Sequence, residues 1–385
     1  MTRLRNDEHH VATPLQAEYY RQRSLASGPG TLLFVESLAV SRRHGGMHHG
    51  GGLWSDEQVA AWKRATDAVH DATDGAVIFA QLFAFGRAAD PTIAAREGFD
   101  VVAASAIPIT KDGGGDGGVG AVAGDVDTGT TKGAVAPRAL TLDEIQQTVR
   151  DYAQAARNAM RAGFDGVEIM AGYGYLLDSF LQDVTNKRED AYGGSIENRS
   201  RLLHEVMKAV VEAVGGPERV GVRLSPWSTF QGMGMVDPIP QFSDVVLKAK
   251  DLNLAFIHLI EARVSGFDDV AQETRGQNME FAYNLWRDGT FLAAGGYTPE
   301  SARRLVDEKY PNMNLIVMFG RHFTSNPDLV FKIKHGLPLT PYRRDKFYYT
   351  GSLADPEEGY TTFAVSKEFK AAQEGTKLDA SPMPL

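Results

Sequence analysis

The sequence predicts a (β/α)8 barrel, in which a parallel sheet closes on itself inside a ring of helices. Short apolar segments with strand character alternate with amphipathic helical segments along most of the 385 residues. The strand segments are apolar on both faces and bounded by Gly, Pro or Asp, as buried parallel strands are. A doubly wound open sheet is the alternative, but no Gly-x-Gly-x-x-Gly motif follows the first predicted strand.

Seven strands are predicted from this pattern. They cover residues 31–37, 76–83, 166–170, 219–226, 255–261, 290–296 and 314–320. A barrel of this type has eight strands, so one strand is missing from the pattern, and its place in the chain order is before residue 1. We therefore predict a barrel that lacks its N-terminal first strand.

Amphipathic helices are predicted between these strands, over residues 55–72, 141–163, 198–216 and 298–309. Ser55 is a typical N-cap, and acidic residues follow it in the first turn. Thr141 and Glu144 have the spacing of a capping box, and Gly163 is a typical stop signal. These signals support the alternation of strands and helices.

Two segments interrupt the alternation, although no linker divides the chain, and residues 1–385 are predicted to form one domain. Residues 111–138 form a Gly-rich insertion, which is typical of a surface loop. A lid is the alternative, because segments that follow barrel strands emerge on the active-site face. The chain from about residue 350 is predicted to be an irregular tail.

Composition and charge limit the partners. The chain is 43% hydrophobic and 23% charged, as globular proteins are, and its net charge of -9 disfavours nucleic acid and anionic membranes. The absence of cysteine excludes disulfides, thiolate nucleophiles and Cys-ligated metals, and no metal site is predicted. No apolar run approaches the ~20 residues of a membrane span. We expect a cytoplasmic protein that acts on a small molecule; its oligomeric state is not predicted.

Polar residues at the carboxyl ends of the strands are the candidates for a site. Gly295–Gly296 and Gly320–Arg321 follow the last two strands, where backbone N–H groups and an arginine suit a phosphate; plain turns and a surface salt bridge are the alternative. Arg223 lies in an apolar strand and needs an anion, an electron-rich ring such as a flavin, or a structural carboxylate. Gln81 could read a pyrimidine-like edge or be a satisfied buried amide.

Several motifs together resemble the old yellow enzyme family of FMN-dependent ene-reductases, fungal members above all. They are "TRLRN" (2–6), "SDEQVAAWK" (55–63), "LQDVTNKREDAYGGSIENRSRL" (181–202) and "VGVRLSP" (220–226). The resemblance extends from residue 2 to about residue 349. It implies a (β/α)8 TIM barrel that binds FMN non-covalently. In this family NADPH reduces the flavin, which then passes hydride to the β-carbon of an activated alkene.

The resemblance also implies roles for individual residues. The cofactor-binding residues would be Thr2, Ser37, Gln81, Arg223, Gly295, Gly296, Gly320 and Arg321. Phe83 stands where the family frequently has Trp in the substrate pocket, and Tyr348 stands where an aromatic residue closes that pocket. The family often has Asn in place of Gly296, a change that keeps the backbone N–H.

The substrate loop departs from the family pattern. The usual string is His-x-x-Asn-Gly-Tyr, whereas this chain has Met170 and Tyr173 followed by Gly174 and Tyr175. The His/Asn pair donates two hydrogen bonds to the substrate carbonyl, as an oxyanion hole does. Met170 cannot donate, and Tyr173 can donate one bond if its ring points inward. Tyr175 is retained as the proton donor, with a core aromatic as the alternative.

These observations predict an FMN-dependent, NADPH-linked oxidoreductase that acts on an activated alkene of a specialised metabolite. The alternative is a non-reductive barrel that has lost ordinary ene-reductase activity. Such a barrel would be an isomerase, a rearrangement catalyst or a ligand-binding protein.

Overall fold

The computed structural model describes residues 1–109, 135–262, 264–265, 268–269, 277–349 and 355–375. Most of the predicted Gly-rich insertion, residues 111–134, lies outside the described residues. The described part of the predicted irregular tail contains one helix, α12 (Lys367–Gln373), and a fully buried Tyr360.

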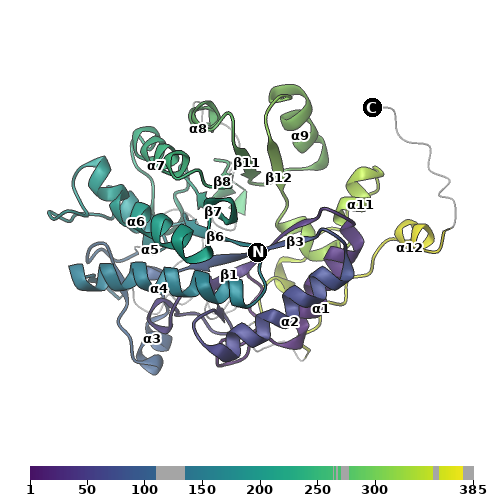
Figure 1. The fold of residues 1–385 in the computed structure, drawn as a ribbon, viewed down its shortest axis with the longest axis horizontal. Coiled ribbons are helices and arrows are strands. Elements are labelled where there is room, and N and C mark those ends of the chain that lie inside the picture. The colour runs from purple at the N-terminus through teal and green to yellow at the C-terminus, as the bar shows by residue number, and fades with distance from the viewer. Residues whose placement is uncertain (110–134, 263, 266–267, 270–276, 350–354, 376–385) are drawn as a thin grey trace.

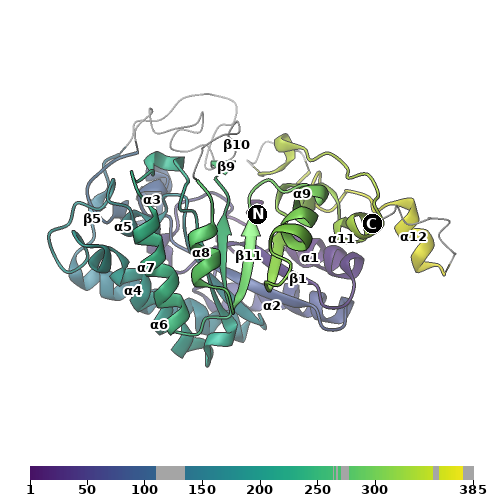
Figure 2. The same cartoon turned by 90° about the horizontal axis from the view of Figure 1, so that it is seen from above.

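One eight-stranded parallel sheet forms the centre of the molecule, with the strand order β12-β11-β8-β7-β6-β3-β1-β2 (Figures 1 and 2). Its strands are β1 (Leu32–Ala39), β2 (Gly51–Gly52), β3 (Val77–Phe83), β6 (Gly166–Ala171), β7 (Val220–Leu224), β8 (Phe256–Ile260), β11 (Thr290–Ala294) and β12 (Leu315–Met318). All seven predicted strands are present, and from β1 through β3 to β12 they are neighbours in chain order. This order excludes the doubly wound alternative, in which the strand order reverses.

Helices surround the sheet in Figure 1. They are α1 (Pro14–Ser27), α2 (Asp56–Ala72), α3 (Pro91–Glu97), α4 (Leu142–Arg161), α5 (Leu176–Leu181), α6 (Ile196–Val214), α7 (Ile239–Asp251), α8 (Glu280–Leu285), α9 (Pro299–Arg303), α10 (Arg321–Ser325), α11 (Leu329–Lys334) and α12. Short strands pair outside the main sheet, β4 (Val102–Ala103) with β5 (Arg138–Ala139), and β9 (Val264–Ser265) with β10 (Asp268–Asp269). None of the helices in the described part of the chain is long and apolar enough to cross a membrane.

The predicted helix signals are confirmed where the structure tests them. The Ser55 side chain accepts a hydrogen bond from the backbone N–H of Gln58, and Thr141 and Glu144 form the expected capping box. The fourth predicted helix is α9, which continues as a π-helical segment over Arg304–Lys309. Helix α1 was not predicted, because it buries the polar side chains of Gln16 and Arg23 and shows no apolar stripe.

Apolar side chains fill one end of the space inside the sheet. Phe79, Phe256 and Leu292 are buried there, and Phe34 and Ile316 pack against them. A larger apolar core lies around them and includes the residues that join the sheet to the helices, such as the fully buried Trp62 of α2. The polar residues discussed below lie above this apolar layer, at the carboxyl ends of the strands.

The sheet has two edges, at β12 and beyond β1. Strand β2 pairs only with the last residues of β1, Leu38 and Ala39. Residues 1 and 2 lie beside this end of β1, where the Ser37 backbone N–H donates to Thr2 Oγ1 at 3.3 Å. No strand of the described residues pairs with both β12 and β1. The predicted absence of a first strand stays a prediction.

Candidate active site

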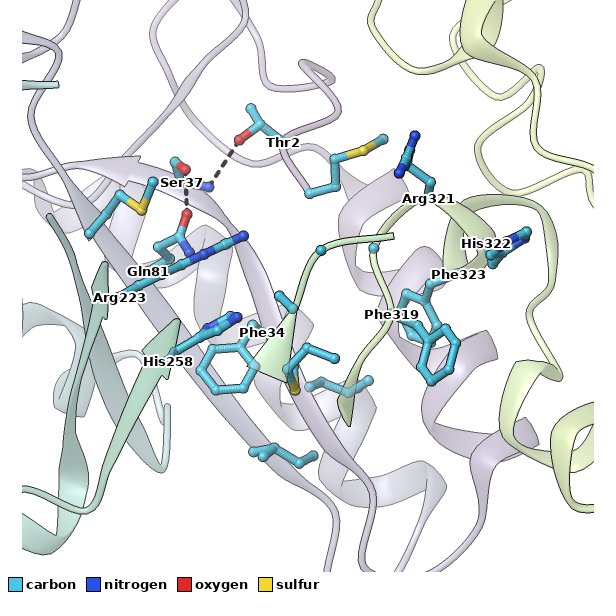
Figure 3. Close-up of a pocket in the computed structure, with 18 of the residues that line it drawn as sticks. Thr2, Phe34, Ser37, Gln81, Arg223, His258, Phe319, Arg321, His322 and Phe323 are labelled. Atoms are coloured by element: carbon cyan, nitrogen blue, oxygen red, sulfur yellow. Dashed lines mark hydrogen bonds between the residues drawn. The ribbon is translucent and has the colours of Figure 1, made fainter. Parts of the chain in front are cut away.

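A single cavity of about 810 Å³ collects every candidate site residue. Its lining includes the candidate flavin residues Thr2, Ser37, Gln81, Arg223, Gly295, Gly296, Gly320 and Arg321, and the candidate substrate residues Phe83, Met170, Tyr173, Tyr175 and Tyr348. Figure 3 shows Arg223 and His258 beside each other on one side of the cavity and Arg321 on another. The strand ends that carry these residues are far apart in sequence, so the parallel sheet brings them together.

One side of the cavity, here called the polar wall, consists of Ser37, Gln81, Arg223 and His258, supported from behind by Glu168. Ser37, Gln81 and Glu168 are register partners across β1, β3 and β6. Ser37 Oγ donates to Gln81 Oε1 at 2.5 Å, and Gln81 Nε2 donates to Glu168 Oε2 at 2.5 Å. The amide of Gln81 is therefore held in one orientation.

Glu168 is fully buried and pairs with His258, whose Nδ1 lies 2.6 Å from Glu168 Oε1. Burial opposes ionisation of Glu168, but His258, Arg223 and Gln81 together lower its pKa below the ordinary value. Burial also lowers the pKa of His258. An anionic Glu168 beside a neutral His258 is consistent with both directions.

The polar wall has hydrogen-bonding capacity left for a ligand. Gln81 uses one N–H and one lone pair in the contacts above, so it retains one donor and one acceptor. Arg223 Nε is buried and has no hydrogen-bond partner among the described residues. A ring edge with adjacent acceptor and donor atoms, such as the pyrimidine edge of a flavin, fits this set. FMN is therefore compatible with the residues present.

The glycines on the Arg321 side of the cavity leave space for a ligand close to the protein backbone. Gly295 has φ +125°, and a Cβ there would lie 2.9 Å from Glu261 Cβ, so a side chain is excluded. A Cβ at Gly320 would meet nothing within 4 Å. Arg321 donates to the Tyr342 hydroxyl at 3.4 Å, and its guanidinium lies 5.5 Å from that ring's centre. Residues of this kind could hold a phosphate.

A second part of the cavity lining, here called the aromatic wall, adjoins the polar wall and is apolar, and its Met170 on β6 is the register partner of Arg223 on β7. Met170 and Phe83 are 4% and 3% exposed, in a cluster with Phe85 against which Tyr173, Tyr175 and Tyr348 pack. The Phe83 and Tyr175 rings have their centres 4.4 Å apart in an edge-to-face arrangement. Because Met170 offers no proton, this wall has only phenol hydroxyls as side-chain donors among these residues.

The loop after β6 sets the direction of both tyrosines. Tyr173 has φ +58°, which is uncommon for a non-glycine residue, and its backbone N–H donates to Ser225 Oγ at 2.7 Å. Its ring lines the cavity, and the Arg223 guanidinium lies 6.0 Å from the centre of that ring. Burial raises the pKa of both Tyr173 and Tyr175, so both phenols stay protonated at neutral pH.

A buried carboxyl group supports this loop from below. Asp178 is fully buried, and its Oδ2 accepts from the Gly174 backbone N–H at 2.7 Å. Burial raises the pKa of Asp178 to about 7.

Tyr348 reaches the cavity because two buried arginines hold the segment beside it. Arg3 Nε donates to the Phe347 carbonyl at 2.8 Å, and Arg5 Nη1 donates to the same carbonyl at 3.0 Å. The Tyr349 backbone N–H in turn donates to the Arg3 carbonyl at 3.2 Å. The N-terminal segment thus fixes the residue that we predicted to close the pocket.

Sequence reasoning missed several of these residues. Glu168 and His258 lie in the apolar strand segments "GVEIM" and "FIHLI", and they carry the same signal that singled out Arg223, a charged or polar residue inside an apolar strand. Asp178 and Ser225 carried no comparable signal, because their role depends on the folded path of the loop after β6.

A parallel sheet with its polar residues gathered at the carboxyl strand ends is the arrangement of a barrel enzyme. Residues 1–340 match the NADH:flavin oxidoreductase / NADH oxidase family. The "Chanoclavine-I aldehyde reductase fgaOx3" of Penicillium roqueforti (strain FM164) is 46% identical over 375 residues, which are 97% of this chain and 93% of that protein.

Two further proteins show the same relationship. The "Probable inactive reductase easA" of Epichloe festucae var. lolii is 43% identical over 374 residues, 96% of this chain and 90% of that protein. The crystal structure of Old Yellow Enzyme from Pichia sp. AKU4542 has a TM-score of 0.80 and 37% identity, covering 96% of this chain and 89% of that chain. The chain therefore belongs to the NADH:flavin oxidoreductase / NADH oxidase family and is an oxidoreductase of the old yellow enzyme type, with its barrel fold.

Proposed function

We propose that this protein is an FMN-dependent, NADPH-linked oxidoreductase that acts on an activated alkene of a specialised metabolite. The observation that carries this proposal is the polar wall. Gln81 is held in one orientation by Ser37 and Glu168, and its remaining donor and acceptor match the edge of a flavin ring. Because the chain belongs to a family of flavin oxidoreductases, this oriented set of hydrogen-bonding groups supports the proposal that the chain binds FMN.

The residues divide the binding of FMN between them. Thr2 and Ser37 would contact one edge of the ring, Gln81 would hydrogen-bond its pyrimidine edge, and Arg223 would balance negative charge on it. The phosphate would be held by the backbone N–H groups and the guanidinium of Gly295, Gly296, Gly320 and Arg321. The flavin, when bound, supplies the redox chemistry that no side chain of the protein can perform.

Tyr175 holds the proton that the reduced alkene needs. Its phenol is buried beside Phe83, and burial keeps it protonated at neutral pH. A general acid in this position supplies a proton to the carbon next to the one that is reduced.

The aromatic wall determines which alkenes are accepted. Met170, Phe83 and Tyr348 bind the substrate by apolar contact, and Tyr173 supplies at most one hydrogen bond to a carbonyl. We infer that the natural substrate is activated by its own structure, for example by an iminium group or extended conjugation.

Binding and reduction of FMN test the proposal. Purified protein is titrated with FMN by fluorescence quenching, and the complex is then treated with NADPH or NADH without oxygen. We expect saturable binding and bleaching of the flavin absorbance, faster with NADPH. A protein that stays colourless after FMN is supplied, with no quenching, would disprove the proposal.

A non-reductive barrel is the second candidate. The loss of both usual carbonyl donors favours it, and one relative carries the name "Probable inactive reductase easA". The two candidates differ in whether NADPH is consumed. If NADPH bleaches the bound flavin and an alkene re-oxidises it in stoichiometric amount, the non-reductive candidate is excluded; product formed with no consumption of NADPH would favour it.

The two ends of the sheet, at β12 and β1, belong to this proposal as well. We propose that the position between β12 and β1 accepts a further parallel strand that would end beside Met1 and Thr2. A strand-forming segment fused before Met1 should then tighten FMN binding and raise the melting temperature. Unchanged values for both would contradict this proposal.

We also propose that the protein is cytoplasmic, because its net charge of -9 and its nicotinamide-linked chemistry suit that compartment. A fluorescent fusion expressed in a filamentous fungus would test this location. Accumulation of the fusion in an organelle would contradict it.

A further inference from the structure

His258 has one ring nitrogen that the protein itself does not use. The side chain is 3% exposed, and it lines the same cavity as the candidate flavin residues. Nδ1 faces Glu168, whereas Nε2 is buried and has no hydrogen-bond partner among the described residues. A buried polar atom without a partner is costly, so a ligand that completes it would gain that free energy.

The contact with Glu168 determines which nitrogen carries the proton. An ionised carboxylate only accepts hydrogen bonds, so Nδ1 must donate to Glu168 Oε1 across the 2.6 Å contact. In a neutral imidazole the other nitrogen is then an acceptor. Nε2 therefore presents a lone pair to the cavity and suits a ligand hydroxyl or N–H.

The sheet register shows which part of a ligand would reach His258. His258 on β8 is the register partner of Arg223 on β7 and of Leu292 on β11. Since side chains at paired positions of parallel strands point to the same face, Arg223 and His258 enter the cavity at the same level. Figure 3 shows them side by side and directed toward the side on which Arg321 lies.

Strand β8 lies between the strand that carries Arg223 and the strand that ends at Gly295. Arg223 belongs to the proposed ring site, and Gly295 belongs to the proposed phosphate site. A ligand that occupies both sites has to cross β8 with the chain that joins its ring to its phosphate. In FMN this chain is a polyol, whose hydroxyl groups can donate hydrogen bonds.

We propose that His258 Nε2 accepts a hydrogen bond from a hydroxyl of the polyol chain that joins the flavin ring to its phosphate. This inference rests on the proposed function. It assigns a binding role to a residue that sequence reasoning did not select. Glu168 then has two tasks, because it orients Gln81 toward the ring and fixes the tautomer of His258 for the polyol.

Three flavins that differ only in their side chain test the inference. Lumiflavin has the ring alone, riboflavin adds the polyol, and FMN adds the phosphate. Dissociation constants are measured by fluorescence quenching for the native protein, His258→Phe, His258→Gln and Arg223→Ala. His258→Phe removes the acceptor, whereas His258→Gln keeps an N–H for Glu168 and an oxygen for the polyol.

We expect His258→Phe to raise the dissociation constants of riboflavin and FMN by about five- to tenfold, which is the effect of one hydrogen bond. The dissociation constant of lumiflavin should rise by less than about twofold. His258→Gln should bind all three flavins nearly as the native protein does. Arg223→Ala should weaken the binding of all three flavins, because Arg223 acts on the ring that they share. This contrast separates a contact with the polyol from a contact with the ring.

Equal losses of affinity for lumiflavin and riboflavin in His258→Phe would overturn the inference, since His258 would then act on the flavin ring through Glu168 and Gln81. Unchanged affinities for all three flavins would also overturn it, while leaving the proposed function intact. A native protein that binds none of the three flavins would instead overturn the proposed function, and this inference with it.

A second measurement does not depend on the folding of His258→Phe. The nitrogen-15 resonance of His258 Nε2 is followed in native protein labelled at histidine, with His258→Gln used for its assignment. A hydrogen bond to this nitrogen should shift the resonance on addition of riboflavin and much less on addition of lumiflavin. Equal shifts for the two ligands would contradict the inference.

Discussion

The two walls of the cavity are built on different principles. The polar wall is a chain of short hydrogen bonds from Ser37 through Gln81 and Glu168 to His258, with distances of 2.5, 2.5 and 2.6 Å. The aromatic wall consists of Met170 and rings that contact one another through their faces and edges. The polar wall depends on the directions and charges of its hydrogen-bonding groups, and the aromatic wall depends on the shapes of its side chains.

This difference bears on the predicted departure of the substrate loop from the family pattern, because the two walls should tolerate substitution to different degrees. Removing one partner from a buried hydrogen-bonded chain leaves another group unsatisfied, so each member constrains the next. Apolar packing tolerates exchange of residues of similar size at lower cost. We therefore expect the aromatic wall to be the part of the site in which substitutions change substrate preference without loss of the cofactor.

Replacing Tyr175 by Phe tests whether the aromatic wall contains any catalytic group. The substitution removes only the phenol hydroxyl and preserves the edge-to-face contact with Phe83. We expect the re-oxidation of reduced flavin by an alkene substrate to slow about a hundredfold or more, the usual effect of a lost general acid. Reduction of the flavin by NADPH should not change. If re-oxidation is also unchanged, Tyr175 is a packing residue.

Met170→His together with Tyr173→Asn should give the substrate loop the two hydrogen-bond donors that the family resemblance implies. A cyclic enone should re-oxidise the reduced flavin about a hundredfold faster, because donors that stabilise the developing negative charge are regained. Asn also tolerates the φ of +58° at this position better than Tyr. Stopped-flow absorbance without oxygen measures the rates, with each single variant as a control. A native protein that is already as fast would contradict our interpretation of the loop.

Arg223→Ala and Met170→Ala compare the two walls directly, since Arg223 and Met170 are register partners on neighbouring strands. We expect Arg223→Ala to weaken FMN binding by roughly tenfold or more, the effect of a charge-assisted hydrogen bond. Met170→Ala should change it by less than about threefold, because Met170 faces the substrate. FMN titration measures both. Similar dissociation constants for the two variants would show that the assignment of the walls is wrong.

Asp178→Asn tests the support beneath the aromatic wall. Burial raises the pKa of Asp178 to about 7 from an ordinary value of 3.8, so its neutral form is favoured in the folded protein. Stability from this group is fully present below the unfolded pKa and is lost as the pH rises toward about 7. Asn keeps the acceptor for the Gly174 N–H and cannot ionise.

We expect the free energy of unfolding of the native protein to fall by on the order of 2 kcal/mol more than that of Asp178→Asn between about pH 5 and about pH 8. Urea titrations at both pH values, followed by circular dichroism, give the four free energies. Parallel pH profiles for the two proteins would show that Asp178 is not the group responsible.

Much of the architecture followed from local patterns. All seven predicted strands lie in the main sheet, because a buried parallel strand has to be apolar on both faces and this leaves a readable pattern. The candidate residues at the strand ends all line one cavity, because parallel strands place their carboxyl ends on one face. Arg223 was recognisable alone, since a charge in an apolar strand requires a partner.

The pairing of polar residues, by contrast, depended on tertiary structure. Glu168 and His258 are 90 residues apart, and only the register across β6, β7 and β8 brings them within 2.6 Å. The same holds for Arg3 and Phe347, whose contact positions Tyr348 over the cavity. The sequence by itself determined the barrel and the set of candidate residues, because periodicity and burial act locally. Which of them bond to each other, and which atom stays available for a ligand, was decided by the folded sheet, because a hydrogen bond requires its partners at a defined distance and direction.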